Sequence, residues 1–149
     1  MAIDEVDAHD AAMPVAVPPL HRHFAAAVEQ VPLVRRAAHE WLHKVLAASG
    51  LPRTEQTDDV VFDVELVVTE LVTNGVNAGA SAVELTATLD DGIRIEVFDD
   101  GSGLPVPQDA PLTSDHGRGL RIVGDVAAEW GTRVEDDGRT LVWARIATD

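Results

Sequence analysis

The spacing of apolar residues changes near the middle of this chain, and that change limits the folds it can adopt. In the first half, apolar residues recur every three or four positions, which predicts helices over residues 33–48 and 57–78. From Val83 onward, apolar and polar residues alternate, which predicts strands that bury one face. The chain is therefore expected to place a pair of helices before most of its sheet.

Asp-Gly turns divide the second half into two hairpins. Asp90-Asp91-Gly92 separates the alternating runs 83–89 and 93–97, and Asp136-Asp137-Gly138 separates residues 131–134 from 139–146. Asp-Gly between alternating runs is typical of a tight β-hairpin. The remaining expected segments are a strand over 21–28, a loop over 99–116 and a helix over 119–129. Hairpins with helices on one face predict an α+β two-layer sandwich with a mixed, mostly antiparallel sheet.

Length, charge and composition narrow the function classes. The 149 residues suit one domain, expected over residues 20–149 after an acidic, Ala- and Pro-rich tail over 1–19. The absence of Cys excludes disulfides and thiolate metal sites, and the net charge of −15 argues against nucleic-acid binding. No apolar run approaches the ~20 residues of a membrane helix, and the N-terminus does not have the pattern of a secretory signal. We therefore expect a cytoplasmic protein that neither spans nor binds a membrane.

Polar residues interrupt the apolar helix 57–78 along one line. Glu70 and Asn74 are four residues apart, so they lie one turn from each other, and Asn77 falls on nearly the same line. A carboxylate on a mostly apolar helix costs free energy unless it is paired, hydrated or directed at a ligand. Taken alone, Glu70 fits either a solvent-facing helix edge or a ligand site.

Three glycine-containing motifs follow. They are Asp99-Asp100-Gly101-Ser102-Gly103 after a strand, Gly117-Arg118-Gly119-Leu120 at a helix start, and Gly138-Arg139-Thr140 before the last strand. Glycines let a backbone approach a ligand closely, and a helix start exposes N–H groups that suit phosphate. Each motif alone is equally typical of an ordinary turn.

In this order and spacing, the four motifs resemble those of the GHKL, or Bergerat-fold, ATPases over residues 21–147. The segment Thr69-Glu70-Leu71-Val72-Thr73-Asn74, the short interval between the glycine motifs and the C-terminal strand resemble the anti-sigma-factor serine/threonine kinases of the RsbW and SpoIIAB type. The resemblance implies a histidine-kinase-like ATPase fold that binds ATP and Mg²⁺.

The resemblance also implies a role for each motif residue. Glu70 is the general base, which takes a proton from a substrate serine or from water, and Asn74 holds Mg²⁺. Asp99 accepts a hydrogen bond from the adenine amino group, and Thr140 supports the adenine site. The other nucleotide-binding positions are Asn77, Gly101, Gly103, Gly117, Arg118, Gly119 and Leu120, with residues 104–116 as a short lid.

The implied function is an anti-sigma factor and kinase. Such a protein sequesters a sigma factor, phosphorylates a serine on an anti-anti-sigma (STAS) antagonist, and commonly forms a homodimer. The family often has His and Ala where this chain has Ala78 and Gly79. The alternative is therefore an ATP-binding regulatory module that captures proteins without kinase turnover.

A different motif points to a zinc peptidase. His39-Glu40-Trp41-Leu42-His43 spells H-E-x-x-H, in which two His at i and i+4 bind zinc and the Glu acts as base. The helical period, however, places Trp41 and Leu42 on the core stripe and both His on the opposite face, among cations. A zinc cleft is not expected on that face.

Overall fold

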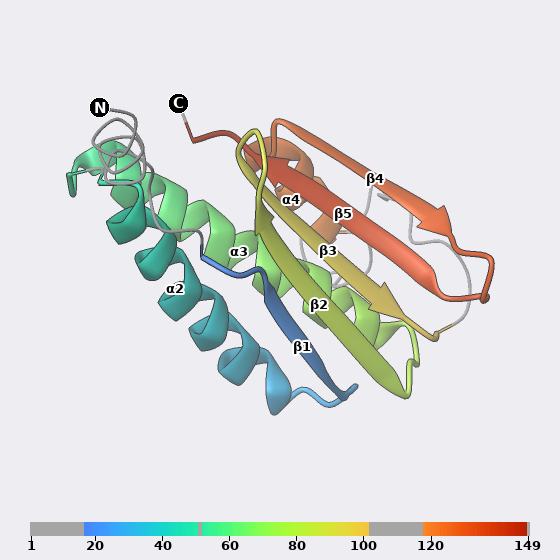
Figure 1. Ribbon diagram of the computed structural model, residues 1–149. Coiled ribbons are helices and arrows are strands. Elements are labelled where there is room, and N and C mark those ends of the chain that lie inside the picture. The colour runs from blue at the N-terminus through green and yellow to red at the C-terminus, as the bar shows by residue number, and fades with distance from the viewer. Residues whose placement is uncertain (1–16, 51, 102–117, 149) are drawn as a thin grey trace, which may run out of the picture.

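A computed structural model describes residues 17–50, 52–101 and 118–148 of the chain (Figure 1). The elements follow in the order β1 (Leu20–Ala25), α2 (Gln30–Ala48), α3 (Glu55–Asn77), β2 (Ala82–Leu89), β3 (Ile93–Asp99), α4 (Arg118–Val126), β4 (Glu129–Val134) and β5 (Thr140–Ile146). The helix–helix–hairpin order expected from the sequence is confirmed, and residues 1–16 of the expected tail lie outside the described residues.

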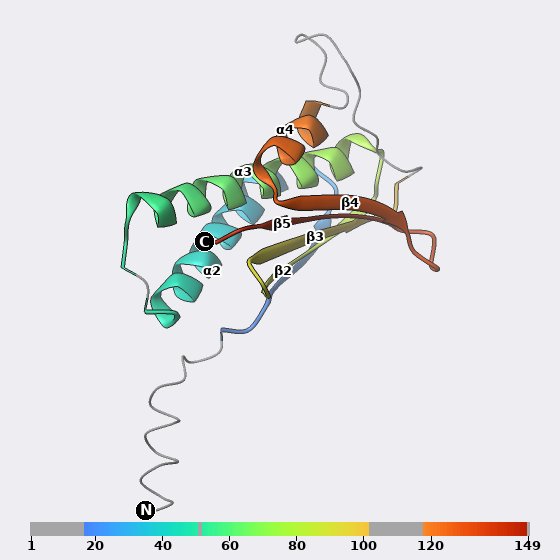
Figure 2. The same cartoon turned by 90° about the horizontal axis from the view of Figure 1, so that it is seen from above.

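Within the described residues, the strands form one five-stranded sheet in the order β1-β2-β3-β5-β4. The three helices of this part of the chain lie on one face of the sheet (Figure 2), so the two-layer α+β sandwich is confirmed. A mixed sheet was expected, but every pair of neighbouring strands is antiparallel. The sequence between β3 and β5 supplies α4 and the edge strand β4, which returns antiparallel to β5.

Helix α2 buries the apolar stripe that its period predicts, including Ala38 and Leu42, which are both 0% exposed. Its core neighbour Trp41 donates an indole N–H to the carbonyl oxygen of Pro18 at 2.8 Å. The helix starts at Gln30 rather than at residue 33, so Pro32 lies in its first turn, where the missing N–H costs nothing. The expected strand over 21–28 accordingly ends at residue 25.

Helix α3 begins with a capping box that the sequence analysis overlooked. The side chain of Thr54 accepts a hydrogen bond from the N–H of Thr57, and Thr57 reciprocates by accepting from the N–H of Thr54. This cap satisfies otherwise unpaired N–H groups and moves the helix start from residue 57 to Glu55. The other end fits the expectation, because Gly79 adopts a left-handed φ of +78° just beyond the helix.

Helix α3 is not buried on every side, although its sequence is mostly apolar. Val64, Val67, Val68 and Leu71 are all 0% exposed, whereas Phe62 is 66% exposed. The run of apolar residues hides this difference, because periodicity alone does not show how much of a helix circumference the sheet covers.

Truncating Val64 should therefore lower the free energy of unfolding much more than truncating Phe62. Val64→Ala is expected to lower the free energy of unfolding by about 2 kcal/mol, since it removes buried methyl groups and leaves a cavity. Phe62→Ala should change it by about 0.5 kcal/mol or less, because the ring lies mostly in solvent. Urea unfolding of both variants measures the difference, and equal destabilisation would contradict the assigned face of α3.

Both expected hairpins are present. Asp91 and Gly92 have φ values of 49° and 104°, the positive pair that a tight I′-like turn needs. A Cβ at Gly92 would stand 2.5 Å from the carbonyl oxygen of Ile146, so only glycine fits there. In the second hairpin Gly138 has a φ of 88°.

The segment after the long loop differs in its boundaries. The expected helix 119–129 spans Arg118–Val126, and β4 starts at Glu129 rather than at residue 131. Trp130 pairs with the buried Ala144 of β5 and packs against the core, with its indole close to Gly124 of α4. Burial of this side chain draws residues 129–130 into the sheet. None of the described helices is long and apolar enough to cross a membrane.

Candidate functional site

Polar residues from α3, β3 and β5 lie where the C-terminal half of α3 passes over the end of β3. Asp99 ends β3 and lies directly opposite Thr140, the first residue of β5. Helix α4 packs against α3 on the same face of the sheet (Figure 2). Segments that are up to 70 residues apart, from Glu70 to Thr140, are thus brought to one end of the sandwich.

Asp99 is a carboxylate held inside the protein. It is 3% exposed, and its Oδ1 accepts a hydrogen bond from the N–H of Gly101 at 2.9 Å. The pKa of the Asp99 carboxyl is raised above its usual value, mainly by burial. The hydrogen bond from Gly101 offsets part of this rise, and the nearby charge of Asp100 adds to it. Its Oδ2 faces α3, 3.6 Å from the place where a Cβ of Gly75 would stand. A buried acceptor with its second oxygen against a glycine is suited to recognising a donor group on a ligand.

The neighbouring Asp100 has a structural task. Its Oδ1 accepts hydrogen bonds from the N–H groups of Ser81 at 2.6 Å and Ala82 at 3.1 Å. These two hydrogen bonds hold the pKa of the Asp100 carboxyl below its usual value, and the bond from Ala82 has the larger effect. Asp100 thus fixes the start of β2, and only Asp99 points into the site. The family resemblance had selected Asp99 rather than Asp100, whereas the apolar alternation alone, which was expected to end at residue 97, did not separate the two.

Gly101 lies in a place too narrow for a side chain. A Cβ there would stand 2.8 Å from the carbonyl oxygen of Ala78 and 3.1 Å from its Cβ. The chain after β3 therefore passes directly against the end of α3. This contact defines the floor of the site next to Asp99.

A matched pair of glycine substitutions tests this packing. Gly101→Ala is expected to cost about 1–3 kcal/mol, because the added methyl group meets backbone atoms that cannot move aside. Gly75→Ala should be tolerated, since its Cβ would meet Val83 and Asp99 at ordinary distances of 3.4 Å and 3.5 Å. Thermal unfolding of both variants is the measurement, and a Gly101→Ala protein as stable as Gly75→Ala would contradict the packing.

Glu70 lies against the first turn of α4. A Cβ at Gly119 would stand 2.7 Å from Oε2 of Glu70, so the glycine leaves room for this carboxylate. Glu70 is half-buried, and it has interaction partners in the structure. Leu120, 2% exposed, anchors the same turn of α4 in the core. The first turn of α4 and Glu70 are thus neighbours in the fold.

The two asparagines differ in exposure. Asn74, half-buried, follows Glu70 by one helical turn, and Asn77 is the exposed last residue of α3. Amide oxygens are hard donors of the kind that Mg²⁺ accepts in proteins. Thr140, 1% exposed, completes the group on the sheet side.

Some expected site residues fall outside what the structure describes. Gly103, Gly117 and the expected lid over 104–116 belong to this part of the chain. Arg118 is the first residue of α4, and its side chain is likewise outside the described part. The roles expected of these residues stay predictions.

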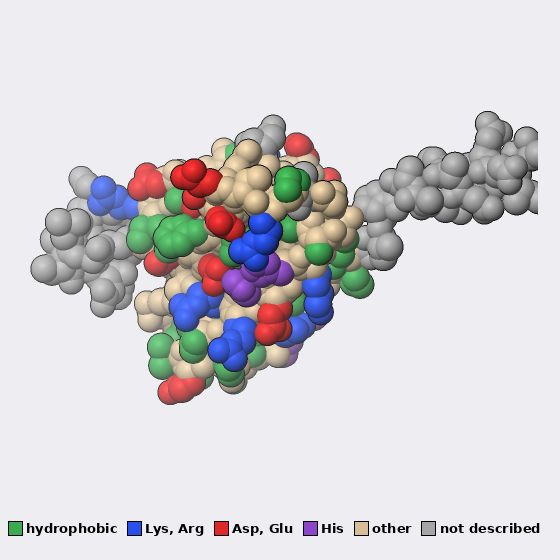
Figure 3. All heavy atoms as spheres, turned by 90° about the vertical axis from the view of Figure 1, so that its left-hand side faces the viewer, with side chains coloured by type: hydrophobic (Ala, Val, Ile, Leu, Met, Phe, Trp, Pro, Cys, Tyr) green, Lys and Arg blue, Asp and Glu red, His purple; other side chains and the backbone are tan. Residues whose placement is uncertain are grey.

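The histidines of the H-E-x-x-H motif lie elsewhere, along the seam between α2 and α3. His39 Nδ1 is 3.1 Å from Oε2 of Glu65 on α3, and its ring centroid is 4.3 Å from that of His43. They are therefore half-buried beside α3 rather than fully outward as expected. Figure 3 shows histidine side chains on this side of the molecule, bordered by cationic and acidic ones. Within the described ranges, no group of three or more His, Asp or Glu is placed to hold a metal ion.

One comparison with known proteins gives a match. A family model described as a histidine kinase-like ATPase domain matches residues 24–146, which include every described residue of the site. No curated protein matches the chain.

Proposed function

The chain belongs to the histidine kinase-like ATPase family, and from this we propose that it binds Mg-ATP at the described site and acts as an anti-sigma-type serine/threonine protein kinase. Membership in the family supports ATP binding and a regulatory function of the GHKL type. The kinase reaction, the magnesium ion and the protein partners go beyond it and are our proposal.

The observation that carries the proposal is the buried Asp99. An adenine ring presents an amino donor at one edge, and Asp99 offers the acceptor that such a donor needs inside a protein. Gly101 lets the chain pass close beside it, and Thr140 lies directly across the sheet. The residues present therefore fit an adenine at this end of the site.

The other end fits phosphates and a cation. The first turn of α4 lies beside Glu70, and the N–H groups and positive dipole end of a helix start suit phosphate. Asn74 supplies an amide oxygen for Mg²⁺, one turn along α3 from Glu70. Bound Mg-ATP would supply a γ-phosphoryl group whose charge the metal partly neutralises.

Glu70 is the residue we assign to the proton. Its carboxylate accepts the proton of a substrate serine hydroxyl as that oxygen forms its bond to phosphorus and the bond to ADP breaks. Gly119 leaves room for this carboxylate beside the first turn of α4, which supports the assignment. The chain then contributes positioning and charge, which are the main requirements of phosphoryl transfer.

The partner assignment rests on the resemblance of Thr69 to Asn74 and of the C-terminal strand to anti-sigma kinases. We propose a sigma factor as the sequestered protein, a serine of an anti-anti-sigma (STAS) protein as substrate, and a homodimer as the working form. An acidic chain with net charge −15 suits a partner with a basic surface, because opposite charges steer association.

Transfer of label from γ-labelled ATP to a STAS protein of the same genome tests the kinase proposal. We expect label on one serine and none when that serine is changed to alanine. ATP binding without any transfer would instead favour a nucleotide-gated binding module. The replacement of the family's usual His by Ala78 is the observation that keeps this second function in view.

A further inference from the structure

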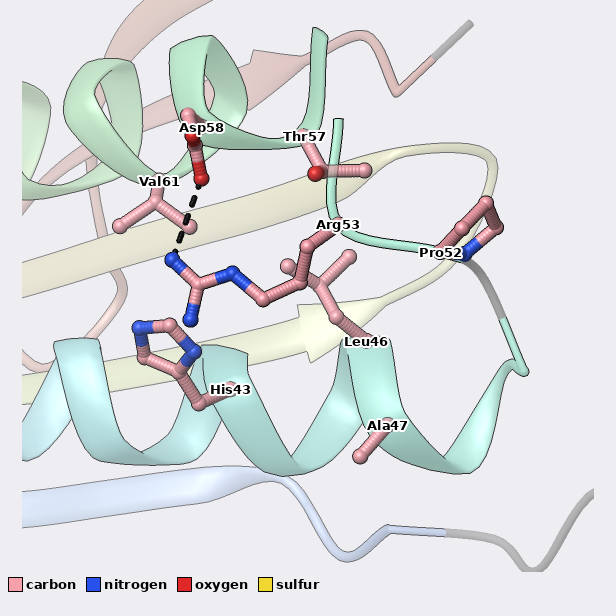
Figure 4. A pocket seen from close by; sticks show the side chains of 8 residues that line it. All are labelled: His43, Leu46, Ala47, Pro52, Arg53, Thr57, Asp58 and Val61. Atoms are coloured by element: carbon pink, nitrogen blue, oxygen red, sulfur yellow. Dashed lines mark hydrogen bonds and ion pairs between the residues drawn. The ribbon is translucent and has the colours of Figure 1, made fainter. Parts of the chain in front are cut away.

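A pocket lies where the end of α2 meets the start of α3, at the opposite end of α3 from the nucleotide site (Figure 4). Its volume is about 280 Å³. Asp58 lies at its mouth, and Glu70 follows twelve residues later, which is about 18 Å along a helix. The pocket is therefore separate from the site described above, and small beside the roughly 300–1,000 Å³ of most ligand sites.

The inner wall of the pocket is apolar. Leu46 and Ala47 of α2 and Val61 of α3 line it, and Val61 is only 9% exposed. Such a wall removes an aliphatic side chain from water at a gain of about 0.8 kcal/mol for each buried CH₂ group. The size and lining fit one branched aliphatic side chain.

The mouth carries opposite charges. The guanidinium of Arg53 lies between the imidazole of His43 and the carboxylate of Asp58 (Figure 4), with 3.3 Å from Nη2 to Oδ1 of Asp58. This contact uses one N–H donor of Arg53 and one oxygen of Asp58. Further N–H groups of Arg53 and the second oxygen of Asp58 can therefore contact a ligand. Their side chains are 75% and 61% exposed, and so exposed a pair contributes little by itself.

We propose that this pocket binds a free apolar α-amino acid of leucine size. The carboxylate of the amino acid contacts Arg53, and its ammonium group contacts the second oxygen of Asp58. The aliphatic side chain of the amino acid lies on Leu46 and Val61. An apolar wall below a cation and an anion matches the three parts of such a zwitterion. A ligand without net charge also escapes the repulsion that a chain of net charge −15 exerts on anions.

The test is a two-dimensional NMR titration of the full chain with leucine, 4-methylpentanoate and 3-methylbutylamine. The two analogues lack the ammonium and the carboxylate respectively. Leucine at millimolar concentration is expected to shift the amide signals of Ala47, Thr57 and Asp58 saturably. Each analogue should bind about two- to fivefold more weakly, since each loses one exposed charge contact. No saturable shift with leucine, or equal binding of an analogue, overturns the proposal.

Variants locate the binding. Arg53→Gln and Asp58→Asn should each weaken leucine binding by about two- to fivefold, and Ala47→Phe should abolish it by filling the cavity. Arg36→Gln, an exposed change on α2 outside this pocket, is the matched control and should leave it unchanged. Unaltered binding by Ala47→Phe would place leucine elsewhere and overturn the assignment. ATP binding does not enter this readout, so the result is independent of the proposed function.

Discussion

Replacing Asp99 with Asn is expected to weaken ATP binding by about 10- to 150-fold while the protein stays folded. The factor corresponds to the loss of a hydrogen bond to a charged group, about 1.5–3 kcal/mol. The buried Asp99 carboxylate is assigned as the acceptor for the adenine amino group. In the variant, the oxygen of the new Asn side chain keeps the hydrogen bond from Gly101, and the amide NH₂ then faces the adenine amino group. Two donors that face each other do not form a hydrogen bond. Calorimetric titration of both proteins with Mg-ATP measures the difference.

Stability provides the control for this variant. Burial raises the pKa of the Asp99 carboxyl in the folded protein, so this group favours folding at low pH and loses that contribution as pH rises through the raised pKa. At neutral pH the buried charge is therefore a cost that Asn removes. The nucleotide-free variant should be at least as stable as the wild type in urea, and a clearly destabilised variant would mean that lost binding reports damaged folding.

Replacing Glu70 with Gln is expected to lower phosphoryl transfer by about 10²–10⁴-fold, the usual contribution of a positioned general base. Gln keeps the shape of the side chain against Gly119 but does not accept a proton at physiological pH. ATP affinity should change only a few-fold, because the adenine contacts are untouched. Single-turnover transfer to the serine substrate, beside calorimetry with ATP, separates the two effects.

Glu65→Gln is the matched control, since Glu65 lies on the same helix and pairs with His39 away from the site. It should leave transfer unchanged. Full transfer activity in Glu70→Gln would show that another group takes the serine proton, and the assignment of Glu70 as base would then be wrong.

Most of the fold could be predicted because its elements have clear periods. The core residues Ala38, Leu42 and Val64 follow the helical stripe, and the turn at Asp91-Gly92 has the expected positive φ values. The misses have local causes. The cap at Thr54 depends on a reciprocal bond with Thr57 rather than on apolar pattern, and the exposure of Phe62 depends on where the sheet ends.

The site was predictable as a set of motifs but not as a geometry. Spacing along α3 placed Glu70 and Asn74 on one line, and that holds for any helix. That Asp99, rather than Asp100, points inward follows from the register of β3 against β5. The approach of Glu70 to Gly119 depends on how α4 docks, which is a tertiary contact between segments 49 positions apart.

The central claim is that this chain binds ATP at Asp99, and a calorimetric titration of the wild-type protein with Mg-ATP tests it most directly. The account predicts saturable binding and, at a hundred times Kd, a rise in the free energy of unfolding of about 2.7 kcal/mol, visible as a higher Tm. GTP, which has an oxygen where adenine carries its amino group, should bind far more weakly. Absence of heat and of any Tm change at millimolar ATP, or equal binding of GTP, would contradict the account.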